Sequence, residues 1–65
     1  MKILVNGTLC DTTATDLAAA LKDLGYGGST VATAVNGEFV PVSLRPDSPL
    51  AEGDRLEVLA PMQGG

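Results

Sequence analysis

Short stretches of alternating apolar and polar residues, each bounded by turn residues, occupy much of the chain. Two of them surround an Asn-Gly pair, with residues 2–5, 6–7 and 8–10 in the first case and residues 31–35, 36–37 and 38–40 in the second. Asn-Gly supplies the two residues with positive φ that a type I′ turn needs. The pattern therefore predicts two β-hairpins, one at the start of the chain and one near its middle.

An apolar stripe with helical spacing lies between the two predicted hairpins. Its members recur at positions i, i+3, i+4 and i+7: Leu17, Ala20, Leu21 and Leu24. Thr13 is placed to cap the start of a helix, with Asp16 three residues later as in a capping box. Gly25 stands where a left-handed residue ends a helix. We expect a helix over residues 14–24.

The remaining chain predicts turns and one further strand. Three prolines break the segment 42–50 into turns with at most one short strand: Pro41, Pro46 and Pro49. Residues 55–59 alternate strongly enough to form a strand, which Pro61 ends. Two hairpins, one helix and this strand predict an α+β domain in which a mixed sheet of four to five strands packs on one main helix.

The period of two along the strands also assigns residues to the two faces of that sheet. The residues expected on the face covered by the helix leucines are Ile3, Val5, Leu56 and Val58. Leu4 and Leu59 point the other way, where they could form an exposed apolar patch with Arg55 and Glu57 as its polar rim. These four residues are the predicted docking site for a partner protein.

Composition and charge exclude several classes of function. The 65 residues contain four Lys and Arg, eight Asp and Glu and no His, which gives a net charge of −4. Without His, and with Cys10 as the single cysteine, the sequence offers no zinc site, no Ser-His or Cys-His nucleophile pair and no disulfide framework. We expect no bound metal or cofactor and no nucleic-acid partner, because four cations cannot neutralise a run of phosphates.

Features of localisation and organisation are few. The apolar start at residues 1–5 is too short for the core of a signal peptide, and no apolar stretch is long enough to span a membrane. We expect a soluble, cytoplasmic monomer with one domain over residues 1–60 and a flexible tail over residues 61–65. Cys10 has no basic neighbour in sequence and is interpreted as a small strand residue.

The tail ends in Gly64-Gly65, preceded by Met62 and Gln63. A diglycine end is slim enough to enter a narrow channel, and it has one reactive group, the carboxylate of Gly65. Transfer of AMP from ATP would convert that carboxylate into an acyl-adenylate, which a sulfur nucleophile could displace to give a thiocarboxylate. Taken alone, the dipeptide favours a frayed terminus or a cloning remnant, because glycine is common at disordered ends.

Four segments together give the chain a family resemblance: residues 1–7 (MKILVNG), 33–38 (TAVNGE), 50–58 (LAEGDRLEV) and the terminal diglycine. In this order and at this length, the sequence resembles the sulfur carriers of thiamine biosynthesis, the ThiS family of ubiquitin-like proteins. The resemblance covers the whole chain and implies a β-grasp fold, in agreement with the predicted strand order.

The resemblance also implies a function and its partners. It implies that an E1-like enzyme uses ATP to adenylate Gly65, that a cysteine desulfurase route supplies sulfur for the thiocarboxylate, and that thiazole synthase consumes it. Gly64, Gln63 and Met62 would thread the tail into these enzymes, and the carrier itself would catalyse nothing. No motif is recognised in residues 42–48.

Other functions remain open at this point. The chain could be a ubiquitin-like carrier for tRNA thiolation or for molybdopterin synthesis. It could also be a β-grasp interaction module with incidental glycines, or a protein modifier that is attached to lysines. The chemistry of the C-terminal carboxylate separates these classes.

Overall fold

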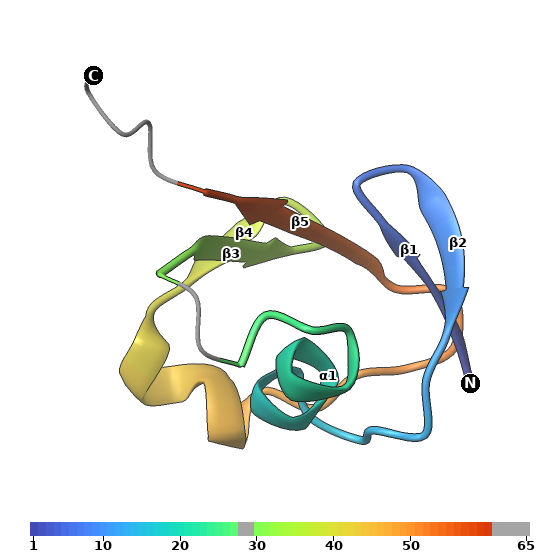
Figure 1. Cartoon of the computed structure of the whole chain (residues 1–65), viewed down its shortest axis with the longest axis horizontal. Coiled ribbons are helices and arrows are strands. Elements are labelled where there is room, and N and C mark those ends of the chain that lie inside the picture. The colour runs from blue at the N-terminus through green and yellow to red at the C-terminus, as the bar shows by residue number, and fades with distance from the viewer. Residues whose placement is uncertain (28–29, 61–65) are drawn as a thin grey trace.

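The computed structural model of the chain describes residues 1–27 and 30–60. Within these ranges the elements follow one another as β1 (Lys2–Val5), β2 (Thr8–Asp11), α1 (Leu17–Asp23), β3 (Ala32–Val35), β4 (Glu38–Val40), the 3₁₀ helix η1 (Val42–Asp47) and β5 (Arg55–Leu59). The strands lie in one sheet, and α1 and η1 lie together on one side of it (Figure 1).

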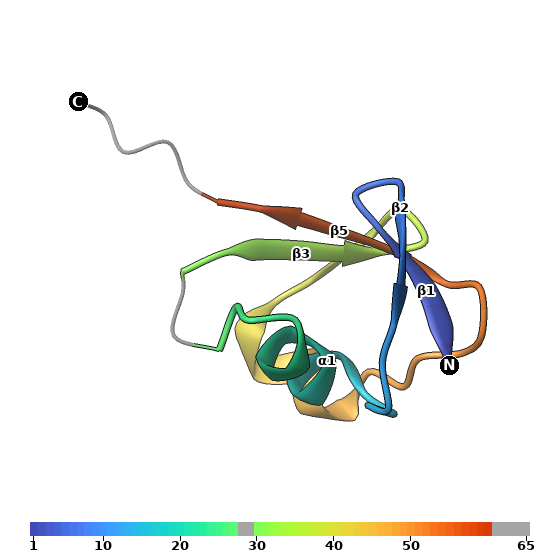
Figure 2. The same ribbon diagram turned by 45° about the vertical axis from the view of Figure 1, so that its right-hand side comes forward.

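The sheet has the strand order β2-β1-β5-β3-β4. β1 and β5 are parallel neighbours in its centre, and the two hairpins extend it antiparallel on either side. Figure 2 shows α1 below the sheet. The strand order places β1 and β3 on opposite sides of β5. This is the mixed, five-stranded sheet on one main helix that the sequence predicts, in the arrangement of a ubiquitin-like β-grasp fold.

Both predicted hairpin turns are confirmed. Asn6 and Asn36 each have a φ of 50°, and the glycines that follow them have φ values of 84° and 86°. Two successive residues with positive φ define the type I′ turn, whose twist matches that of the flanking strands. The local Asn-Gly chemistry therefore fixes the register of both hairpins.

The predicted helix start is wrong by three residues. The helix begins at Leu17 instead of residue 14, and Asp16 caps it in place of Thr13 by accepting a hydrogen bond from the Ala19 amide at 2.8 Å. The preceding backbone is extended because the Leu17 amide donates to Ser48 O and the Leu50 amide donates to Thr15 O, both at 2.9 Å. These bonds to residues far along the chain compete with an earlier helical turn.

The segment expected to consist of turns contains the six-residue helix η1. The Arg45 side chain reaches from η1 to β3, where its Nε donates to Thr33 Oγ1 at 3.1 Å and a terminal nitrogen donates to Val31 O. Thr33 is 2% exposed, and its hydroxyl donates in turn to Val40 O. A partly buried network of hydrogen bonds thus holds η1 against the second hairpin.

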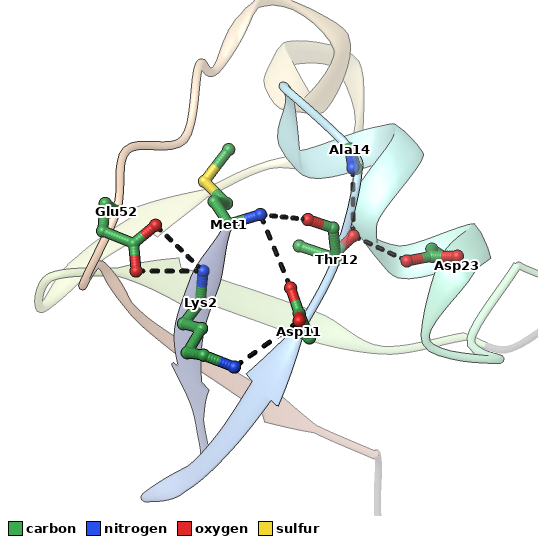
Figure 3. A network of polar contacts seen from close by, with 7 residues as sticks. All are labelled: Met1, Lys2, Asp11, Thr12, Ala14, Asp23 and Glu52. Atoms are coloured by element: carbon green, nitrogen blue, oxygen red, sulfur yellow. Dashed lines mark hydrogen bonds and ion pairs between the residues drawn. The ribbon is translucent and has the colours of Figure 1, made fainter.

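A second network holds the start of β1 (Figure 3). The Met1 ammonium donates to Thr12 O at 2.6 Å, and the Thr12 hydroxyl donates to the Asp23 carboxylate at 2.6 Å. On the other side, both oxygens of Glu52 accept from the Lys2 backbone amide at 3.1 and 3.2 Å. These contacts join β1 to α1 and to the turn that leads into β5.

The core lies between the sheet and α1, on the face that the sequence predicts. Every strand residue assigned to the covered face is buried, with exposures between 0% and 8%: Ile3, Val5, Leu56 and Val58. Leu17, Ala20 and Leu21 of α1 meet them, and Leu24 packs against this cluster while partly exposed. The longer of the two described helices, α1, has seven residues and is too short to cross a membrane.

Candidate functional site

The open face of the sheet is formed by the residues of β5 that alternate with its buried ones. Leu56 and Val58 are buried against α1, so Arg55, Glu57 and Leu59 point to the opposite side and are exposed. Since β5 lies between β1 and β3, these three side chains occupy the middle of the open face.

The two predicted leucines do not form one patch. Leu4 is half-buried and pairs with Arg55 at the start of β5, whereas Leu59, which is 67% exposed, pairs with Ala32 at the other end. Four residues of extended strand separate the two ends by roughly 13 Å. The sequence correctly placed both leucines on the open face, but the structure divides them between two areas.

Each leucine has an exposed apolar neighbour that the sequence reasoning missed. Leu9 of β2 stands opposite Leu4 and is 60% exposed. Phe39 of β4 is 69% exposed and stands opposite Ala34, in a surface depression that Leu59 also lines. The signal was present in the sequence, because the two Asn-Gly turns fix these cross-strand pairs.

Glu57 separates the two areas. It lines the depression that contains Phe39 and Leu59, and it also lines the depression beside Leu4 and Arg55. Surfaces that bind another protein combine exposed apolar anchors with polar groups around them, and each of the two areas has such anchors next to the charged side chain of Glu57. Arg55 and Glu57 therefore lie in the middle of the open face, and not around a single patch as the sequence predicts. Their binding role stays a prediction.

The turn that leads into β5 contains a carboxylate held in its charged form. The Asp54 carboxylate accepts from the Ala51 amide at 2.8 Å and from the Asn36 side-chain amide at 3.1 Å. The hydrogen bond from the Ala51 amide, and to a lesser extent that from Asn36, lowers the pKa of Asp54 below its ordinary value. Asp54 therefore stays ionised at neutral pH and fixes the chain just before Arg55.

The predicted reactive end of the chain lies beyond the described residues. β5 ends at Leu59, and Ala60, which is exposed, is the last described residue before the end of the chain. The predictions for Met62, Gln63, Gly64 and Gly65, and the tail assigned to residues 61–65, all lie outside the described residues. The structure does place the strand that leads to them in the centre of the sheet.

Other candidate chemistry has a structural place. Cys10 lies on β2 opposite Ile3 and packs, partly buried, against the core, as a small strand residue does. Among residues 1–27 and 30–60, no three His, Cys, Asp or Glu side chains come together in a way that could hold a metal ion.

Comparison with known proteins gives a family and a structural relative. The crystal structure of the thiamine biosynthesis protein ThiS from Geobacter metallireducens is similar over 100% of both chains, with 25% sequence identity and a TM-score of 0.84. No curated protein matches the sequence. The ThiS family profile matches residues 3–65, nearly the whole chain, and the chain therefore belongs to the ThiS family.

Proposed function

We propose that this chain is a sulfur carrier of thiamine biosynthesis and that Gly65 carries the sulfur. The observation that supports the proposal most directly is the family match, which runs from residue 3 through the terminal diglycine. The similarity to the Geobacter metallireducens thiamine biosynthesis protein over the full length of both chains agrees with it. In this proposal, the domain of residues 1–60 is the part that other proteins recognise.

The proposed chemistry takes place at the C-terminal carboxylate. A carboxylate oxygen of Gly65 attacks the α-phosphorus of ATP, and pyrophosphate leaves. A sulfur nucleophile then attacks the carbonyl carbon of the acyl-adenylate, the bond to the AMP oxygen breaks, and AMP leaves with the electron pair. When that nucleophile is a persulfide, the product is an acyl disulfide, and a thiol then attacks the S–S bond, forms a new disulfide and releases the thiocarboxylate. The thiocarboxylate donates its sulfur to the forming thiazole.

Partner enzymes perform each step, and the carrier is their shared substrate. An E1-like enzyme binds the ATP and forms the adenylate, a cysteine desulfurase route supplies the sulfur, and thiazole synthase consumes it, all in the cytoplasm. The open face supports docking on such enzymes, because Phe39 and Leu59 expose apolar surface beside the charged side chain of Glu57.

Pyrophosphate exchange followed by intact-mass measurement tests the proposal. With the cognate E1-like enzyme, exchange between ATP and pyrophosphate should depend on the carrier. With the sulfur source added, the carrier's mass should rise by the exchange of one oxygen for one sulfur. Gly64→Val should block both signals, because a branched Cβ widens the chain and restricts φ beside the reacting carboxylate. The exposed loop variant Ala51→Val is the matched control and should react as the wild type does.

The same measurements separate the alternatives. Absence of both exchange and added sulfur, with an enzyme known to be active, would favour a β-grasp interaction module. Activation followed by attachment to lysines, without a thiocarboxylate, would identify a protein modifier. A thiocarboxylate that thiazole synthase does not consume would point to tRNA thiolation or molybdopterin synthesis.

A further inference from the structure

The two hairpin turns place an asparagine side chain at each end of the same strand. Asn6 and Asn36 have the same φ of 50° in the same type of turn, and both side-chain amides bond to the chain at β5. Asn36 bonds at the start of the strand, where its Oδ1 accepts from the Arg55 amide at 3.0 Å. Asn6 bonds near the end, at Val58.

The Asn6 side chain behaves as an additional peptide unit of β1. Its Nδ2 donates to Val58 O at 3.0 Å, and its Oδ1 accepts from the Val58 amide at 2.9 Å. The Asn6 backbone amide already donates to Leu56 O at 2.9 Å. The side chain therefore continues the parallel ladder two residues further along β5, although the β1 backbone itself turns away at Gly7.

The contact between Asn6 and Val58 lies close to the end of β5, where the chain leaves the sheet. On the β3 side, β5 is paired as far as Leu59, which lies opposite Ala32. On the β1 side, strand pairing ends at Leu56, and Asn6 supplies the bonds at Val58. With Asn6 in place, β5 is held from both sides until two residues before Ala60.

We propose that Asn6 is a positioning residue for the reaction at Gly65. It fixes the end of β5, so that the chain leaves the sheet in one direction and the C-terminal carboxylate is presented to the activating enzyme from a docked domain. This inference rests on the proposed function. Asn6 touches no reacting atom, and its effect comes from restricting the orientations that the docked carrier samples, which can change a rate by orders of magnitude.

Asn6→Gly and Asn36→Gly form a matched pair of variants. Glycine adopts positive φ readily, so both turns are kept. Asn6→Gly loses two hydrogen bonds to Val58, and Asn36→Gly loses one to the Arg55 amide and one to the Asp54 side chain in the turn before β5. The experiment measures kcat and KM for the carrier in pyrophosphate exchange with the cognate activating enzyme. Thermal unfolding of each variant measures the purely structural effect.

A positioning role predicts different kinetics for the two variants. Asn6→Gly should lower kcat by about tenfold and leave KM within about twofold, because Arg55, Glu57 and Leu59 remain available for docking. Asn36→Gly should leave both constants within about twofold of the wild type at a similar loss of melting temperature. Hydrogen exchange at the Val58 amide should accelerate in Asn6→Gly and stay slow in Asn36→Gly.

The outcomes distinguish this inference from the proposed function. Equal kcat values for Asn6→Gly and the wild type, or equal losses in the two variants, would overturn the positioning role and leave the carrier function standing. A wild-type chain that supports no exchange with an active enzyme would overturn the carrier function, and the role of Asn6 with it.

Discussion

The two faces of the sheet are formed by alternating residues of the same strands, but they differ in how deeply their side chains are buried. On the covered face of β5, Leu56 and Val58 are 1% and 5% exposed, whereas Leu59 on the open face is 67% exposed. Burying a leucine contributes about 2 kcal/mol relative to leaving it in water, so the covered residues hold the fold and the open ones contribute little to it. An apolar side chain that does not stabilise the domain is available for binding.

The difference in burial between the two faces explains how a very small domain can keep a stable core and still expose apolar side chains for binding. The chain has only 65 residues, and within the residues that the structure describes one helix layer covers one side of the sheet while no element covers the other. The residues of the open face can therefore change with little effect on stability, and the residues of the covered face cannot. Four comparisons of matched variants test this division.

The largest effect is expected for a leucine of the covered face. Leu21 is 4% exposed in the core, and Leu21→Ala should lower the free energy of unfolding by about 2–5 kcal/mol through the cavity that it leaves. The same truncation on the open face, Leu59→Ala, should cost less than about 1 kcal/mol. Thermal or chemical unfolding of both variants measures the contrast.

A related control concerns the end of the chain. Deleting Gly64 and Gly65 should leave the melting temperature nearly unchanged if the terminal residues do not pack on the domain. A deletion as destabilising as Leu21→Ala would show that stability and tail chemistry are not separate, and the division into a domain and a tail would be wrong.

The second comparison uses Arg45, which bonds to Thr33 on β3, and Arg55, which lies on the open face of β5. Arg45→Ala removes the partner of Val31 O and one partner of the buried Thr33 hydroxyl, which should cost about 1–3 kcal/mol in unfolding free energy. Arg55→Ala on the open face should change stability by about 0.5 kcal/mol or less. Arg45→Lys should restore little, because one ammonium lacks the fork that reaches both acceptors. Equal losses for Arg45→Ala and Arg55→Ala in urea unfolding would contradict the comparison.

The third comparison concerns binding. Leu59→Glu places a charge beside Glu57 on the open face and should raise KM for adenylation by about tenfold, the effect of losing one apolar anchor. Leu44→Glu makes the same change at a leucine on η1 that is 52% exposed, and should leave KM within about twofold. Circular dichroism should show both variants folded. Equal KM values for Leu59→Glu and the wild type would move the docking site away from this end of the open face.

The features that could be predicted from the sequence depend on neighbouring residues. Asn-Gly determines each hairpin turn within two residues, and the period of two then assigns each strand residue to a face. Leu9 and Phe39 were within reach of the same reasoning, because each lies opposite a residue that the turn fixes.

The features that sequence reasoning missed depend on partners far along the chain. The helix starts at Leu17 because the Leu17 amide donates to Ser48 O and Thr15 O accepts from the Leu50 amide. Arg45 holds η1 through bonds to Thr33 on β3 and to Val31 just before it. The pairing of Asn6 with Val58 joins residues 52 positions apart, in a parallel register that no turn determines. Such contacts arise only when the whole sheet has formed.

The smallest effect concerns acid sensitivity at the turn that enters β5. Hydrogen bonds from the Ala51 amide and from Asn36 lower the pKa of Asp54 in the folded state, so its ionised carboxylate stabilises the fold. This contribution is complete above the ordinary aspartate pKa of about 3.9 and is lost as the pH falls through the lower folded value. The exposed Asp11 carboxylate acts in the same direction, since Lys2 and then the N-terminal ammonium hold its pKa down.

Asp54→Asn should therefore lower the melting temperature by a few degrees at pH 7 and by less at pH 3, where the wild type has lost part of the same contribution. Glu57→Gln makes the same change from carboxylate to amide at an exposed side chain of the open face, and at pH 7 it should change the melting temperature by less than Asp54→Asn does. Melting curves of the three proteins between pH 2 and pH 7 measure the difference. A loss for Asp54→Asn that did not shrink on acidification would show that the turn depends on the shape of the side chain and not on its charge. In that case, the negative charge of Asp54 would contribute as little to stability as that of Glu57. The turn and the open face would then differ only in how their side chains pack.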